Sequence, residues 1–62
     1  MTYPNAIEFR VIWENGTHTD VIVNDETRRL FRGKDDEEIA GALACVGRTS
    51  YARLQIREVV QV

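Results

Sequence analysis

The sequence predicts a two-layer α+β domain, in which one helix covers one face of an antiparallel or mixed sheet of three or four strands, in the order β-β-(β)-α-β. Three observations indicate this class. Residues 7–13 alternate apolar and polar side chains, residues 17–23 form a second run rich in β-branched residues, and residues 35–46 carry a capped helical pattern. The 62 residues form a single domain, 1–62, because so short a chain leaves no room for a second core.

The loop between the first two runs sets the register of the predicted hairpin. A two-residue turn at Asn15-Gly16 would place Asp20 on the apolar face. A three-residue loop with a left-handed glycine instead pairs Phe9 with Val21, and Arg10 with Asp20 as a favourable cross-strand ion pair. Since a slip of one residue would invert every side chain, we predict the three-residue loop.

The segment Thr27–Arg32 admits two interpretations, a short third strand or a single helical turn. We favour a short edge strand, because arginines on an edge strand discourage pairing with another sheet. The residues before it, Asn24–Glu26, are typical of a turn.

The clearest helical pattern runs from Asp35 to Val46. Asp35 is a good N-cap, and Glu38 three residues later completes an Asp variant of the capping box. Gly47 is placed to end the helix in the left-handed conformation. The stripe that we expect to pack on the sheet consists of Ile39, Ala42, Leu43 and Val46.

The last predicted strand spans Tyr51–Val62, and a right-handed crossover through the helix brings it beside the first strand. Glu58 interrupts the apolar face of this strand, so we expect it near the sheet margin or in an ion pair. The apolar face itself is formed by Leu54, Ile56, Val60 and Val62.

The charges nearly balance, since 8 basic and 10 acidic residues give a net charge of −2. Proteins that bind nucleic acid normally carry a basic excess, so the charge argues against nucleic acid as a partner. No apolar run is long enough to span a membrane, and we expect no membrane partner. The single cysteine excludes an intramolecular disulfide and favours a reducing, cytoplasmic location.

No pattern of residues predicts an enzyme, a cofactor site or a metal site. His18 and Cys45 are the only histidine and cysteine, and a catalytic triad or a metal centre needs further groups at suitable spacing. We therefore predict no catalytic, cofactor-binding or metal-ligating residue. His18 is expected to face solvent on the sheet, where it can titrate at a partner surface.

Two surfaces are candidates for binding another protein. The first is the acidic run Asp35, Asp36, Glu37 and Glu38. These carboxylates either stabilise the helix N-terminus or present charge to a partner. The second is the sheet face away from the helix, whose apolar side chains form an association patch or are merely scattered. That face is expected to carry Ile12, Ile22 and Val59 among His18, Arg10 and Arg57.

A third surface is the helix face that we expect to point away from the core, formed by Ala40, Gly41, Ala44 and Cys45. A glycine inside a helix lowers helix stability by about 1 kcal/mol relative to alanine, so the presence of Gly41 suggests a role for a small residue at this position. Small residues let a second helix approach closely, which favours an isologous homodimer. The alternative is neutral drift on an exposed face.

In size, strand–helix order and mixed charge, the chain resembles the small phage-encoded inhibitors, among them anti-CRISPR proteins and phage inhibitors of host RNA polymerase. The resemblance implies a non-enzymatic protein that blocks a host nucleic-acid-handling complex in the host cytoplasm, with the Asp35–Glu38 run competing for a basic groove. The resemblance rests on no sequence motif, so it assigns no functional role to any residue of this chain. The alternatives are a small homodimeric accessory module and a weak nucleic-acid binder that uses Arg28–Lys34 with Arg53 and Arg57.

Overall fold

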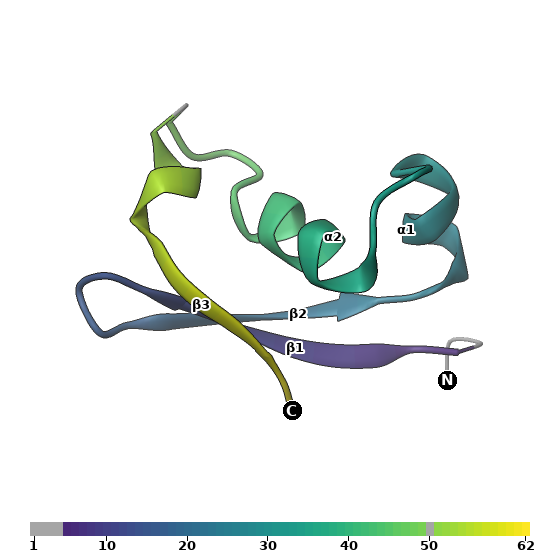
Figure 1. Ribbon diagram of the computed structural model, residues 1–62, viewed down its shortest axis with the longest axis horizontal. Coiled ribbons are helices and arrows are strands. Elements are labelled where there is room, and N and C mark those ends of the chain that lie inside the picture. The colour runs from purple at the N-terminus through teal and green to yellow at the C-terminus, as the bar shows by residue number, and fades with distance from the viewer. Residues whose placement is uncertain (1–4, 50) are drawn as a thin grey trace.

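A computed structural model describes residues 5–49 and 51–62 of the chain. Three antiparallel strands form one sheet in the order β2-β1-β3, and the helices lie together on one side of it (Figure 1). The elements are β1 Ile7–Trp13, β2 His18–Val23, α1 Asp25–Leu30, α2 Asp36–Ala44, the 3₁₀ turn η1 Ala52–Gln55 and β3 Ile56–Gln61. The predicted α+β class is confirmed, and so is the position of the last strand beside the first. Two helices, and not the single predicted one, accompany the sheet.

The hairpin has the register that the three-residue loop predicts. Phe9 lies opposite Val21, and Arg10 lies opposite Asp20. Gly16 has a φ of +89°, the left-handed conformation that such a loop requires. The hairpin therefore directs its large apolar side chains to one face of the sheet and its central ion pair to the other.

Residues 25–30 form a helix, so the prediction of an edge strand at Thr27–Arg32 is wrong. The Asn24 side chain accepts a hydrogen bond from the Thr27 N–H at 3.0 Å, and Thr27 Oγ1 accepts one from the Asn24 N–H at 2.9 Å. This reciprocal capping box satisfies backbone donors at the start of the helix. No residue of α1 is buried, so the segment lacks the apolar stripe that would have indicated a helix.

The helix α2 begins where the sequence predicts, with Asp35 as its N-cap. It ends at Ala44 instead of Val46, because bonds of the i→i−3 type tighten the chain after that residue. Val46, which we expected in the packing stripe, is 73% exposed. Gly47 has the predicted left-handed conformation, with a φ of +78°.

The small residues of α2 face the core, so the expectation that they point outward is wrong. Ala40, Gly41 and Ala44 are buried, and Cys45 is half-buried against them. A Cβ atom at Gly41 would lie 3.7 Å from Ile56 Cδ1, so the helix backbone comes close to the side chains of β3. These residues serve internal packing and offer no exposed surface to a second helix.

The core lies between α2 and the inner face of the sheet. Ile39 of α2, Val11 of β1 and Val23 of β2 are fully buried in one cluster. Phe9 and Trp13 extend that cluster along β1. Burial of this kind contributes about 25 cal/mol per Å² of apolar surface removed from water, and it is the main stabilising contribution to a fold of this size.

The C-terminal segment is a strand only from Ile56, so the prediction of a strand over all of Tyr51–Val62 is wrong in its first half. The strand also contains a β-bulge. Trp13 lies opposite Ile56, whereas the preceding Ile12 lies opposite Glu58, which leaves Arg57 as the additional residue.

This bulge reverses the alternation of side chains along β3. Val59 lies opposite Val11 and faces the core, whereas Glu58 and Val60 lie opposite outward-facing residues of β1. Our expectation that Val59 lies on the outer face is therefore wrong. Glu58 interrupts the apolar pattern because the bulge carries it to the outer face.

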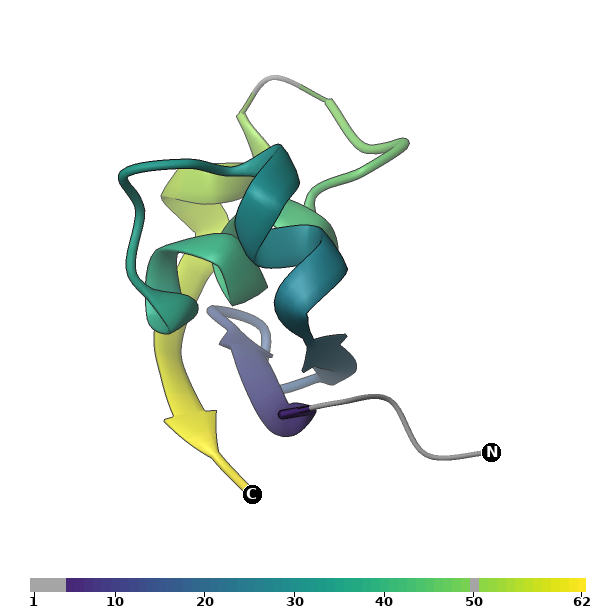
Figure 2. The same ribbon diagram turned by 90° about the vertical axis from the view of Figure 1, so that its right-hand side faces the viewer.

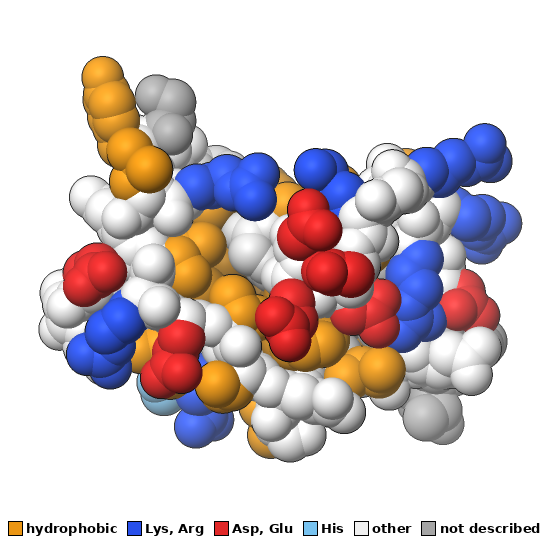
Figure 3. Space-filling model, in the orientation of Figure 1, with side chains coloured by type: hydrophobic (Ala, Val, Ile, Leu, Met, Phe, Trp, Pro, Cys, Tyr) orange, Lys and Arg blue, Asp and Glu red, His pale blue; other side chains and the backbone are white. Residues whose placement is uncertain are grey.

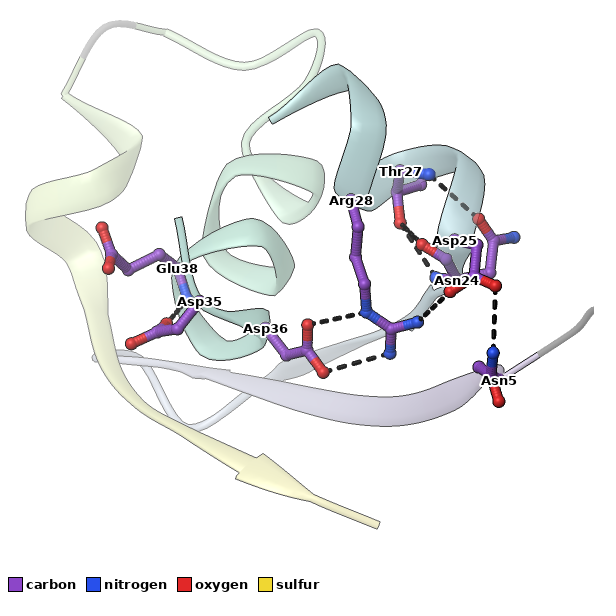
Figure 4. Close-up of polar contacts among 8 residues, drawn as sticks. All are labelled: Asn5, Asn24, Asp25, Thr27, Arg28, Asp35, Asp36 and Glu38. Carbon is purple, nitrogen blue, oxygen red and sulfur yellow. Dashed lines mark hydrogen bonds and ion pairs between the residues drawn. The ribbon is translucent and has the colours of Figure 1, made fainter. Parts of the chain in front are cut away.

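Polar contacts centred on Arg28 join both helices, and Asn5, which precedes β1, is bound to the same group (Figure 4). Arg28 donates to Asp25 at 2.8 Å and to both carboxylate oxygens of Asp36 at 2.9 and 3.1 Å, and Asn5 also donates to Asp25 at 3.0 Å. The Arg28 hydrogen bonds hold the pKa of Asp36 below its usual value. The pKa of Asp25 is lowered by Asn5 and, next, by Arg28. We call these four residues the Arg28 clamp.

Replacement of Gly41 tests the packing of α2. We expect Gly41→Ala to raise the free energy of unfolding by about 0.5–1 kcal/mol, because the added methyl group reaches ordinary contact distance of Ile56 and improves helix propensity. Gly41→Leu should lower it by about 1–3 kcal/mol through overpacking. Urea denaturation followed by Trp13 fluorescence measures both. An alanine variant less stable than the unaltered protein would contradict this account of the helix–sheet contact.

The Arg28 clamp should make stability depend on pH in the acid range. A carboxyl whose pKa is lower in the folded state stabilises the fold at every pH above the ordinary carboxyl pKa of about 3.9. That stability is lost as the pH falls through the folded-state pKa. Asp36→Asn should therefore destabilise the protein at pH 7, and the difference should shrink below about pH 4. Urea denaturation at several pH values measures this, with Glu26→Gln as the control in α1. A difference independent of pH would contradict it.

Candidate functional site

The sheet face opposite the helices is the candidate functional site. The views along and across the molecule agree that α1, α2 and η1 lie on the other side, so no described element covers this face (Figures 1 and 2). We call it the open face. The strand registers assign to it Glu8, Arg10, Ile12, His18, Asp20, Ile22, Glu58 and Val60.

An ion pair occupies the centre of the open face. Arg10 lies between Asp20 on β2 and Val60 on β3, and its guanidinium donates to the two Asp20 oxygens at 3.0 and 3.4 Å. This hydrogen bonding lowers the pKa of Asp20 and raises that of Arg10. His18 Nε2 lies 4.0 Å from Asp20, so a protonated His18 would extend the ion pair along β2.

Apolar side chains flank this pair. Ile22 is 49% exposed and Val60 is 38% exposed, and Ile12 is half-buried. The predicted positions of Ile12, Ile22 and His18 on this face are confirmed. Sequence reasoning missed Val60, because the bulge that turns it outward becomes visible only through the pairing of β3 with β1. The interruption of the apolar pattern by Glu58 was the one signal of that bulge.

The acidic run Asp35–Glu38 is largely engaged within the chain. Asp35 accepts from the Glu38 N–H at 2.9 Å, Asp36 belongs to the Arg28 clamp, and the Glu38 carboxylate lies 3.9 Å from Lys34 Nζ. Glu37 makes no hydrogen bond or ion pair with the described residues. On the face shown in Figure 3, several acidic side chains form a group near the middle, beside basic ones. Most carboxylates of the Asp35–Glu38 run also stabilise the helix layer.

A shallow groove of about 510 Å³ runs between the start of α2 and the sheet. It is lined by Ile7, Phe9, Asp35, Asp36, Glu37 and Gln61. Glu37 therefore lines the same groove as Gln61, which lies at the C-terminal end of β3. A cationic group that reached this end of β3 would meet an unpaired carboxylate.

The basic residues do not form one continuous surface in the described chain. Arg28, Arg29 and Arg32 belong to α1 and the turn after it, whereas Arg53 and Arg57 belong to η1 and β3. α1 and η1 lie toward opposite ends of the long axis, and β3 begins at the η1 end (Figure 1). Arg28 is also bound to two carboxylates. A nucleic-acid binder that needs both groups on one face is therefore not favoured.

A second cavity, of about 240 Å³, lies at the hairpin end of the molecule. The Arg48 guanidinium stacks over the Trp13 ring at 4.6 Å from its centroid and donates to the Ala44 carbonyl at 3.1 Å. Trp13 Nε1 donates to Thr19 Oγ1 at 2.9 Å. These contacts cover the end of the core. Packing therefore explains why the side chains that line the cavity lie where they do.

The helices formed by the described residues are all too short or too polar to cross a bilayer. In the same part of the chain, no three side chains of the types His, Cys, Asp or Glu are grouped so that they could hold a metal ion. No family model, curated protein or solved structure matches the chain.

Ile22 and Val23 are neighbours in β2 on opposite faces of the sheet and provide a matched test of the open face. We expect Ile22→Ser to change the free energy of unfolding by less than about 1 kcal/mol, because the side chain is half exposed. Val23→Ala should cost about 2 kcal/mol, because the side chain is fully buried. Chemical denaturation measures both. Equal losses would show that the open face is covered in solution.

Proposed function

We propose that the protein is a non-enzymatic binding module that docks onto another protein through the open face of its sheet. One observation carries the proposal: apolar side chains on all three strands surround an ion pair on a face that no described element covers. Exposed apolar side chains that lie together on one uncovered face, with charged groups between them, indicate a surface that binds another protein.

The open face is large enough to form part of a docking surface. Three strands spaced about 4.8 Å apart, with about six residues each at 3.4 Å per residue, present about 300 Å². The apolar part of this area is smaller than the whole, because the other residues of the face are charged or polar. Ile12, Ile22 and Val60 would supply apolar contact, and the Arg10–Asp20 pair would orient the partner through charge complementarity.

We further propose that the partner is a larger host complex whose surface this chain occupies, as the resemblance to small phage-encoded inhibitors implies. Inhibition of this kind needs a rigid surface and no catalytic group. The Arg28 clamp and the α2 cap support this requirement, because they join α1 to α2 and hold the start of α2 with contacts inside the chain. In this proposal the module acts in the cytoplasm, and Glu37 is the acid best placed to add a contact to a basic partner.

The proposal is tested by affinity capture from a nuclease-treated bacterial lysate, with capture strength compared among matched variants. Ile22→Glu and Val60→Glu place a charge on the open face, whereas Leu30→Glu and Leu54→Glu place one on α1 and η1, where the side chains are 74% and 79% exposed. We expect a stoichiometric partner that both control variants retain and both open-face variants lose by about tenfold or more. Capture that is equal among all variants, or none by the unaltered protein, would contradict the proposal.

A further inference from the structure

The two edges of the sheet differ in where their charged side chains lie. On β2 the exposed Asp20 lies in the middle of the strand, where a charged side chain discourages edge-to-edge pairing. On β3 the charged Arg57 and Glu58 lie at the start of the strand, beside the bulge, and the stretch from Val59 to Val62 is uncharged. An uncharged stretch of an edge strand with β-branched residues is a template for a further strand.

The backbone of β3 is correctly oriented for this role. The Val62 N–H donates to the Glu8 carbonyl at 2.9 Å, and hydrogen-bonding directions alternate along an antiparallel ladder. Val60 therefore also directs its backbone groups toward β1, whereas Val59 and Gln61 direct theirs away from the sheet. Those groups have no partner in the described part of the chain.

We propose that a second copy of this chain pairs its β3 with this edge, antiparallel and about a two-fold axis at Val59. The result is a homodimer with a continuous six-stranded sheet, since each copy contributes three strands. The helices of both copies lie on the same face, and the open faces join into one surface. This interface is separate from the open face, so it goes beyond the proposed function and does not depend on it.

Charges select the register of the pair. An axis at Arg57 would place that arginine opposite itself, and an axis at Glu58 would place two carboxylates opposite each other, both of which are unfavourable. An axis at Val59 places Arg57 opposite Gln61 of the other copy and Glu58 opposite Val60. No pair of like charges then meets across the interface.

The same register also creates an attractive contact. Gln61 borders the groove that contains Glu37, and Glu37 makes no ion pair with the described residues. Arg57 of the second copy lies opposite Gln61 and so reaches this groove, where the two charges are complementary. The two-fold axis repeats the contact. An axis at Val60 would place Arg57 beyond the end of β3 of the other copy, and the contact with Glu37 would be lost.

Sedimentation equilibrium over a concentration series tests the edge. The unaltered protein should reach a dimer, and Gln61→Pro should abolish it, because proline removes an N–H that points away from the sheet without breaking a bond to β1. Ile22→Pro removes the corresponding outward N–H of the β2 edge and should leave the dimer intact. A protein that stays monomeric up to about 1 mM, or a dimer lost with Ile22→Pro and kept with Gln61→Pro, overturns the proposal.

Charge reversal tests the register independently of proline. Arg57→Glu and Glu37→Arg should each raise the dissociation constant of the dimer by about tenfold, since each weakens two symmetric ion pairs. The double variant, with both charges exchanged, should restore affinity to within about threefold. Circular dichroism confirms that each variant is folded. If the double variant loses as much dimer affinity as the two single variants lose together, the proposed register is wrong.

Discussion

The close approach of α2 to the sheet is the constraint on which the rest of the structure depends. Ile39 can reach Val11 and Val23 only because the helix presents Ala40, Gly41 and Ala44 to the strands instead of larger side chains. A chain of 62 residues has few apolar groups to bury, and it gains more from tight packing of small groups than from a thicker layer. This contact decides which face of the sheet is covered and which is left open.

The sequence was most informative where one alternative had a large physical penalty. The hairpin register followed from the loop, since the other register would have placed Asp20 on the apolar face, and the start of α2 followed from its N-cap. It was least informative where the structure depends on local hydrogen bonds without burial. The helix α1 exists through the capping box of Asn24 and Thr27, and its sequence carries no hydrophobic period.

The candidate site shows the same division. Ile12, Ile22 and His18 could be assigned to the open face because they belong to the hairpin, whose register was predictable. The residues that β3 contributes could not be assigned from the sequence. The single additional residue at Arg57 moves every later side chain of the strand to the opposite face of the sheet. The buried small residues of α2 were assigned to the surface for a related reason: a pattern analysis gives weight to large side chains, whereas a close contact selects small ones.

The difference between the two sheet edges determines how far association can proceed. Pairing about a two-fold axis uses the same edge from both copies, so the proposed dimer leaves only β2 edges at its ends. Those ends carry Asp20 in the middle of the strand, and its charge opposes the addition of further strands. The proposed assembly would therefore be closed at two copies and would not extend into open-ended fibrils.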